Sequence, residues 1–384
     1  MAKKKKPKKT VRAEFRKRHD GRTRNNDLTR QFDEDAEKLE DSTSAERVSG
    51  KGHLTRKRTI SGTNNDEDES GFQVELEVDP DLCLPGRVVR VHGLTSIVRT
   101  ADETEYHCTV RGILKSLATD LQHVVVAGDD VTIQLGNSYA EDLQAVIVRV
   151  DPRRNQICRT SRKRQQIIAS NIDLAIIVAS AAEPMLKPNL VDRFLVSAEK
   201  AQIQPIIVIN KVDLVDPADL QPVVGVWSQM GYPVVLASVV TGMGIARLKH
   251  WVKGKDSVVT GQSGVGKSSI LNAIEPGLQL RVGNVSTENQ KGKHTTTAAF
   301  LIPLKCGGHL IDTPGIRQFQ LWDVIPEEVV GYFRDIRPFI NGCRFPDCTH
   351  THEDDCVVKW AVADGKIDVR RYESYCQMRE VDEY

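Results

Sequence analysis

The eight-residue run G-Q-S-G-V-G-K-S at 261–268 constrains the fold of this 384-residue chain more than any other segment. An apolar strand pattern precedes it at 257–260, and a helical pattern follows it at 269–274. A strand, a glycine-rich turn and a helix in this order cradle nucleotide phosphates, with the lysine on the β- and γ-phosphates and the final hydroxyl on Mg²⁺. The predicted phosphate ligands are Gly261, Gln262, Ser263, Gly264, Val265, Gly266, Lys267, Ser268 and Ser269. Lys267 would also serve catalysis, and Ser268 would hold Mg²⁺.

A second motif selects the base. Asn210, Lys211 and Asp213 belong to an N-K-x-D run directly after the apolar strand pattern at 205–209. The carboxylate of this motif accepts from two guanine N–H groups, the asparagine meets the far edge of the base, and the lysine stem packs along the ring. Adenine lacks that pair of donors and would leave a buried Asp213 unpaired. The motif therefore predicts GTP or GDP as ligand and disfavours an ATP-dependent small-molecule kinase.

Two further segments are expected near the γ-phosphate. Asp312 and Gly315 frame a D-T-P-G run after the strand pattern at 309–311. The carboxylate can organise Mg²⁺ through water, and the glycine amide can sense the phosphate. Thr296, within the run K-H-T-T-T at 293–297, is the expected second Mg²⁺ ligand.

The residue that positions the attacking water needs a separate argument. Ras-like GTPases use a glutamine next to the D-x-x-G motif, but here Ile316 follows Gly315. A neutral imidazole can orient water or take its proton, so His294 is the predicted catalytic side chain. The alternative is that His294 only packs or contacts RNA.

The order of these motifs is unusual. Most GTPases begin with the phosphate loop and carry N-K-x-D late, whereas here N-K-V-D comes first and D-T-P-G last. This order predicts a circularly permuted domain over residues 161–320, built on a mostly parallel sheet with helices on both faces. Asn189 is the expected N-cap of a helix over 189–202. A domain that follows D-T-P-G would be tied to the nucleotide state.

The first 160 residues have a different texture. Residues 1–30 hold thirteen Lys or Arg against three acids, and residues 31–50 hold seven acids against two bases. With few aliphatic residues, 1–75 is predicted to be a disordered charged arm that either meets nucleic acid or only keeps the chain soluble. Short β-branched segments within 76–160 predict a small barrel, and the OB-fold is the commonest such module that binds oligonucleotides.

A basic stretch follows the predicted barrel. It is either a solvated linker or a surface that contacts phosphates, and it comprises Arg153, Arg154, Arg159, Arg162, Lys163 and Arg164. No apolar run approaches the ~20 residues of a membrane span, and no secretory signal is evident. We therefore expect a cytoplasmic protein. We also expect a monomer.

Four side chains near the C-terminus predict a metal site. Cys343, Cys348, His350 and Cys356 fall within fourteen residues, and three thiolates with one imidazole suit a closed tetrahedral Zn²⁺ site. His352 is a competing ligand, and chance clustering is the alternative. The four residues predict a zinc-binding helical domain at 321–384. The remaining cysteines are expected to be ordinary thiols: Cys83, Cys108, Cys158, Cys306 and Cys376.

The barrel, the order NKVD, GQSGVGKSS, GKHTTT and DTPG, and the C-x₄-C-x-H-x₅-C tail together resemble the RsgA (YjeQ) family of bacterial GTPases that depend on the small ribosomal subunit. The likeness covers roughly residues 80–380. It implies a multidomain α/β protein with an OB-like barrel, a circularly permuted P-loop GTPase domain and a zinc domain. It also implies GTP hydrolysis stimulated by the small ribosomal subunit, contacts to its rRNA during late maturation, and GTP or GDP, Mg²⁺ and one Zn²⁺ as cofactors.

The chain departs from the family pattern in the loop that supports guanine. Related GTPases read S-A-K there, whereas this chain reads Ser238, Val239 and Val240. The backbone amide of Val239 could still contact the base, but the lysine is missing. A non-catalytic RNA-binding scaffold that holds GTP as a structural ligand is the alternative function.

Overall fold

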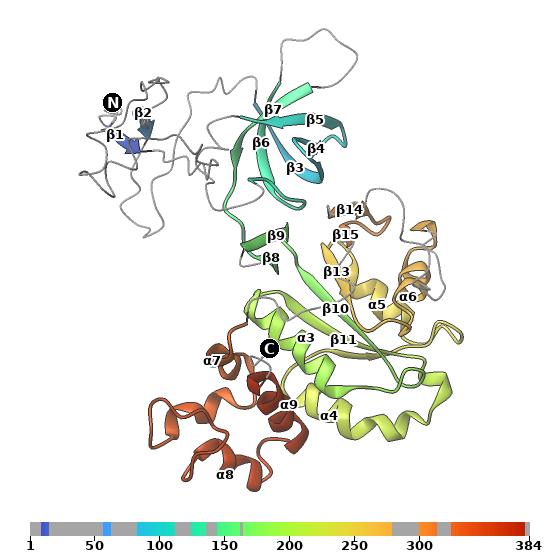
Figure 1. Ribbon diagram of the computed structural model, residues 1–384. Helices are drawn as coiled ribbons and strands as arrows, with labels where there is room; N and C mark the ends of the chain where they lie inside the picture. Colours follow the sequence, from blue (N-terminus) through green and yellow to red (C-terminus); the bar gives the residue numbers. More distant parts are fainter. Residues whose placement is uncertain are drawn as a thin grey trace, which may run out of the picture. The chain divides into compact units, whose positions relative to one another are not determined.

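The computed structural model describes residues 9–14, 57–62, 83–111, 124–135, 144–161, 164–278, 299–312 and 324–380. The chain forms two units, Met1–Asp79 and Pro80–Tyr384 (Figure 1). Among the described residues, no helix has the length and apolar character needed to cross a bilayer.

The first unit contains one pair of antiparallel strands, β1 (Lys9–Glu14) and β2 (Lys57–Gly62). Val11 lies opposite Ile60 in their register, and β-branched residues favour extended backbone. The structure thus differs at these two strands from the disordered arm that we expected over 1–75. The rest of that range lies outside the described residues.

The predicted barrel is confirmed in the second unit. Each strand of the barrel pairs with two others, and the ring closes through β3–β6 and the parallel pair β5–β7. Val88, Val98, Ile133 and Ile147 fill its interior and are fully buried. The strands are β3 (Cys83–His92), β4 (Thr95–Thr100), β5 (Glu105–Val110), β6 (Asp130–Leu135) and β7 (Gln144–Val150).

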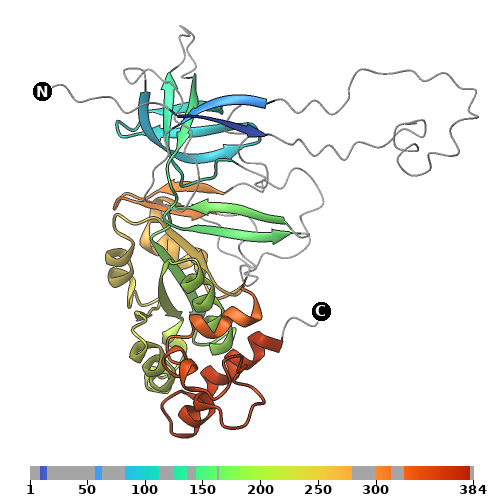
Figure 2. The same cartoon turned by 90° about the vertical axis from the view of Figure 1, so that its left-hand side faces the viewer.

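The first two arginines of the basic stretch after the barrel have partners within the protein. Arg153 binds Asp129 and Arg154 binds Asp173, so these two arginines are ion-paired. Arg159 lies in β8 (Gln156–Ser161) and Arg164 begins β9 (Arg164–Ser170), which pair as an antiparallel ribbon (Figure 2). Arg162 and Lys163 lie outside the described residues.

The nucleotide motifs lie on a mostly parallel sheet, as predicted. Its order is β12-β11-β10-β13-β15-β14, and every neighbouring pair is parallel except β14–β15. Phe300 at the start of β14 pairs with Arg90 of the barrel, so the two sheets are continuous. The strands are β10 (Leu174–Ser180), β11 (Gln204–Asn210), β12 (Val234–Leu236), β13 (Ser257–Thr260), β14 (Phe300–Pro303) and β15 (His309–Asp312).

Helices cover both faces of this sheet (Figure 1). Ile177 of β10 packs with α3 (Pro188–Lys200) and α4 (Gln221–Gln229) on one face. The preceding Ile176 packs with α5 (Ile245–Val252) and α6 (Lys267–Ile274) on the other. Because successive strand side chains point to opposite faces, the continuous apolar run of β10 serves both layers.

The predicted N-cap at Asn189 is wrong. Helix α3 begins at Pro188 with Lys187 in the cap position, and no side chain caps it. Proline suits the first helical position because its φ is fixed at a helical value and no N–H is lost there. The Asn189 side chain instead contacts the C-terminal part of the chain, accepting a hydrogen bond from Ser374 and donating one to Gln377.

The C-terminal segment is helical and packs on α3. Val196 of α3 belongs to the same buried cluster as Phe333, Ile336 and Tyr375. The elements are α7 (Pro326–Val329), the 3₁₀ turns Val330–Tyr332 and Arg337–Gly342, α8 (Val357–Ala363) and α9 (Val369–Glu380). This segment therefore shares a core with the nucleotide-binding domain.

We predict that Asp129→Ala destabilises the barrel. Asp129 is fully buried and pairs with the Arg153 guanidinium at 2.7 Å. It also accepts from Val126 N and Ser170 Oγ. Removing the carboxylate strands a partly buried cation, which costs about 3–5 kcal/mol. Amide hydrogen exchange in β6 and β7 should show opening free energies lower by about that amount.

Arg149→Gln is the matched control, because its ion pair with Asp151 is exposed. That change should alter exchange by less than about 1 kcal/mol. Equal losses of opening free energy in Asp129→Ala and Arg149→Gln would contradict this prediction.

Candidate functional site

The nucleotide motifs meet at one edge of the sheet. Asn210 ends β11, Gly261 follows β13, and Asp312 ends β15. These strands are parallel, so their carboxyl ends share the edge at which ligands bind in open α/β sheets. The structure thus brings together segments that lie up to about a hundred residues apart in the sequence.

Glycines are required where the phosphate loop passes close to other backbone. Gly261 has φ 141°, and a Cβ there would lie 2.0 Å from the Val178 carbonyl oxygen. Gly266 has φ 91°, and its Cβ would lie 2.3 Å from Asn210 Nδ2. Any side chain at these positions would push the loop away from the sheet, so both glycines are fixed by the geometry of the turn.

Lys267 is already turned into the phosphate loop. It begins α6, and its Nζ donates to the carbonyl oxygens of Gly261 at 2.8 Å and Gln262 at 2.7 Å. Ser268 and Ser269 lie in the first turn of the same helix. The positive end of the helix dipole and the ammonium therefore face the same place, which suits an anion.

Asn210 joins the base motif to the phosphate loop. Its side chain is buried, and Nδ2 donates to the Val265 carbonyl at 2.9 Å. Its Oδ1 is buried and has no hydrogen-bond partner within the described structure. A buried acceptor without a donor is costly, so this atom marks a place where a ligand would complete the site.

Lys211 and Asp213 present their side chains differently. Lys211 adopts the left-handed φ of 62°, and its Nζ donates to the Glu183 carbonyl. Asp213 lies in the 3₁₀ turn Val212–Leu214 and is exposed. The burial that we assumed for Asp213 is thus not a property of the protein alone and would have to come with a bound base.

Ser238 shapes the loop that supports the base. Its side chain is fully buried, and its Oγ accepts from the backbone N–H of Thr241 at 3.1 Å. Val239 packs against the apolar cluster of α5 and α6, whereas Val240 is 86% exposed. The missing lysine of the S-A-K pattern is therefore replaced by an exposed apolar side chain.

Several predicted residues cannot be placed. His294, Thr296 and Gly315 lie outside the described residues, and for Asp312 only the backbone is described. Their proposed roles still rest on the sequence.

One loop that contributes to the nucleotide site has no recognisable sequence motif. It connects β10 to α3 over residues 181–187. Pro184 Cδ lies 3.7 Å from the point where a Cβ on Gly264 would stand, and the Glu183 carbonyl accepts from Lys211. The loop therefore touches both the phosphate loop and the base motif.

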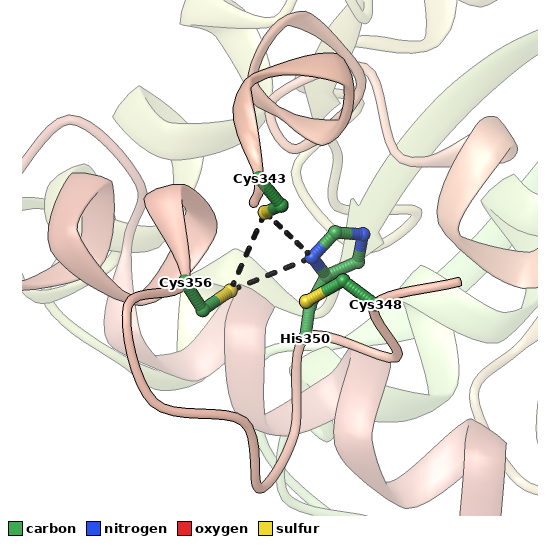
Figure 3. Close-up of side chains that lie close together, drawn as sticks. All are labelled: Cys343, Cys348, His350 and Cys356. Atoms are coloured by element: carbon green, nitrogen blue, oxygen red, sulfur yellow. Dashed lines mark hydrogen bonds between the residues drawn. The ribbon is translucent and has the colours of Figure 1, made fainter. Parts of the chain in front are cut away.

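The four predicted metal ligands converge on one point (Figure 3). Their ligand atoms lie within 4.8 Å of one another. Sγ of Cys343 lies 3.8 Å from Sγ of Cys356, and His350 Nδ1 lies 3.4 and 3.5 Å from these sulfurs. A tetrahedral zinc with ordinary bond lengths requires edges of about 3.8 Å between sulfurs and about 3.5 Å from sulfur to nitrogen. The residues therefore fit zinc.

His352 is not part of this cluster. Its side chain is 80% exposed and its Nε2 faces Glu353. Glu353 accepts from the backbone N–H and hydroxyl of Thr349 and from the N–H of Thr351, which fixes the loop around His350. The competing ligand is thus excluded by orientation.

Burial prepares the cluster for a cation. It lowers the pKa of His350, which keeps the imidazole neutral and able to coordinate. It raises the pKa of the Cys348 thiol to about 12 in the absence of metal. Metal binding must therefore displace thiol protons and becomes weaker in acid.

A parallel sheet that gathers N-K-x-D, a phosphate loop and D-x-x-G in this permuted order defines a circularly permuted P-loop GTPase. A family model described as RsgA GTPase matches residues 150–322. The proteins named "Small ribosomal subunit biogenesis GTPase RsgA" from Gemmatimonas aurantiaca and Pseudomonas aeruginosa are each 39% identical to this chain. The matches cover 77% and 76% of this chain, and 96% and 83% of those proteins.

Two solved structures are similar. YjeQ from Thermotoga maritima is 36% identical with a TM-score of 0.63, over 78% of this chain and 98% of that one. YloQ, described as a circularly permuted GTPase, is 29% identical with a TM-score of 0.60, over 77% of this chain and 94% of that one. The chain belongs to the RsgA GTPase family.

We predict about one Zn²⁺ per chain, the stoichiometry of a closed four-ligand site. Cys348→Ala should lose the metal and make the C-terminal segment sensitive to proteases, because binding and folding of structural zinc sites are coupled. Metal analysis and limited proteolysis test this. Cys306→Ala, in the turn between β14 and β15, should keep both the metal and the resistance. A metal-free wild-type protein with a resistant C-terminal segment would contradict the prediction.

Proposed function

We propose that this protein hydrolyses GTP and acts in the maturation of the small ribosomal subunit. The observation that carries the proposal is the convergence of the Asn210 motif and the phosphate loop at one sheet edge. This occurs in a chain that is 39% identical to relatives named for biogenesis of that subunit. Such a protein would work in the cytoplasm, and we infer that it works as a monomer.

The binding roles of the base motif and the phosphate loop are supported by the geometry of the described residues, and those of Thr296, Asp312 and Gly315 by the sequence motifs. Asn210, Lys211 and Asp213 would hold guanine, assisted by the Ser238 and Val239 loop. The phosphates would replace the carbonyl oxygens that Lys267 now contacts, and the loop from Gly261 to Ser269 would donate its amides. Ser268 and Thr296 would hold Mg²⁺, with Asp312 nearby, and the ion would offset negative charge on the phosphates. Gly315 would sense the γ-phosphate.

His294 is the residue that we infer to position the attacking water. The water oxygen bonds to the γ-phosphorus, the bond to the GDP oxygen breaks, and the imidazole accepts the proton. The support is chemical, because Ile316 offers no hydrogen bond at the position where other GTPases carry glutamine. Slow hydrolysis by the free protein would result if this loop is placed correctly only on the ribosomal subunit.

The barrel and the zinc domain are the parts that we propose to contact rRNA. The barrel is a five-stranded closed sheet, a framework often used for oligonucleotides. The ribbon of β8 and β9 joins it to the GTPase domain and carries a run of basic residues, R-T-S-R-K-R at 159–164. A run of basic residues of this kind suits phosphate contacts.

We predict that purified small ribosomal subunits raise the GTP turnover of this protein. His294→Ala should bind GTP and subunits normally but lose most of the stimulated rate. Single-turnover hydrolysis at saturating subunits is the measurement, since it removes product release. With GTP in excess, an enzyme should release many phosphates per chain, whereas a scaffold that keeps GTP as a structural ligand should release no more than one, with or without subunits.

We also predict that Asp213→Asn changes the base preference. The new amide presents a donor where the carboxylate accepted from guanine, so affinity for GTP should fall and xanthosine triphosphate should bind better. Competition against a fluorescent guanine nucleotide measures both. Asp219→Asn, at an exposed position in the next 3₁₀ turn, is the matched control and should change neither affinity. Wild-type protein that binds ATP as well as GTP would refute this assignment.

A further inference from the structure

Helix α3 forms one wall of a small cavity beside the phosphate loop. Leu190, Val191 and Phe194, from its first two turns, line this cavity together with Gln262 and Val265 of the loop. Val191 and Phe194 are almost fully buried. These turns and the phosphate loop therefore border the same space, and a shift of the turns would change the surroundings of the loop.

The opposite side of the same turns carries a buried ion pair to the zinc domain. Asp192 is 1% exposed, and its Oδ1 lies 2.7 Å from Nη1 of Arg371 on α9. Arg371 is 2% exposed and also donates from Nε and Nη2 to Asp335, both at 3.1 Å. Its guanidinium stacks 4.4 Å from the centre of the Phe333 ring. The Arg371 guanidinium thus connects α3 both to α9 and to the segment that carries Asp335.

Asp192 has further partners that fix its direction. Trp227 Nε1 of α4 donates to Oδ1 at 3.0 Å, and Ser374 Oγ donates to Oδ2 at 2.7 Å. The Ser374 hydroxyl also lies 3.0 Å from Oδ1 of Asn189, one turn earlier on α3. Both carboxylate oxygens are therefore used, and the early turns of α3 are held from α4 and α9 together.

Contacts at the other end of α3 differ in kind. Lys200 pairs with Glu328 at 2.8 Å, and Arg334 pairs with Glu199 at 2.6 Å. The Lys200 and Glu328 side chains are 27% and 43% exposed. These contacts involve the last turn of the helix, so they lie at least one turn beyond Phe194, the last residue of α3 that lines the cavity.

We propose that Arg371 and Ser374 are positioning residues of the nucleotide site. They hold the early turns of α3 against the phosphate loop, and through them the zinc domain sets the affinity for the nucleotide. Coupling of this kind is reciprocal, so a bound nucleotide should also raise the affinity for the metal. The proposal rests on the nucleotide binding included in the proposed function, but it requires neither hydrolysis nor ribosomes.

The test compares perturbations at the two ends of α3. Ser374→Ala removes a hydroxyl without adding volume, so the protein should still fold. It should raise the dissociation constant for fluorescent GDP about fivefold or more, the lower end of usual coupling effects. Arg371→Met should have a larger effect if it folds. Arg371→Lys should bind GDP more tightly than Arg371→Met, because an ammonium can pair with Asp192 but cannot also make the two hydrogen bonds to Asp335.

Glu328→Gln is the matched control at the far end. It breaks an ion pair between the same helix and the same domain, and it should leave the GDP dissociation constant within about twofold of wild type. Urea unfolding of each variant separates positioning from stability, because a merely structural role would shift stability without a difference between the two ends. In equilibrium competition with a colorimetric chelator, added GDP should raise the zinc affinity of wild type but not that of Ser374→Ala.

An unchanged GDP affinity in folded Ser374→Ala would overturn the proposal, as would equal losses in Ser374→Ala and Glu328→Gln. Neither result would affect the proposed function, since wild type would still bind GDP. Failure of wild type to bind GDP at all would instead refute the proposed function.

Discussion

The hydrogen bond from Asn210 Nδ2 to the Val265 carbonyl is the contact on which the nucleotide site depends. It joins the end of β11 to the phosphate loop, two segments separated by 55 positions in the chain. Gly266 must lack a side chain for Asn210 to approach so closely. The same asparagine retains a buried, unpartnered oxygen. One side chain therefore fixes the distance between base site and phosphate site and remains incomplete without a ligand.

The pairing of the strands explains why the permuted motif order is tolerated. Sheet neighbours, not chain order, decide which motifs meet, and β10 lies between β11 and β13 in a parallel arrangement. Moving the termini leaves those pairings intact and changes only what is attached beyond β15. In this chain the attachment is a domain that returns to pack on α3. The permutation thus places the domain that carries the Cys₃His cluster in contact with a helix that also borders the phosphate loop.

The sequence predicted most of the site because its motifs are local. The phosphate loop, N-K-V-D and the four metal ligands each depend on short spacing. The structure brings the four metal ligands together and begins a helix at Lys267 after the phosphate loop. Long-range contacts were missed. Asn189 looked like a cap because asparagine often is one, yet its partners lie more than 180 residues away. Arg153 looked like a phosphate contact, but a buried aspartate 24 residues earlier binds it.

The contact between the two domains combines a shared apolar core with a buried ion pair, and the ion pair has a consequence of its own. Replacing a buried ion pair with apolar residues often costs nothing in stability, whereas removing one partner is severe. An apolar contact between α3 and α9 could slide by a fraction of a turn with little penalty, since dispersion has no preferred direction. Asp192, held by Trp227, Ser374 and Arg371 at once, allows only one register. If the C-terminal domain positions the phosphate loop through α3, a single register between α3 and α9 matters more than added stability.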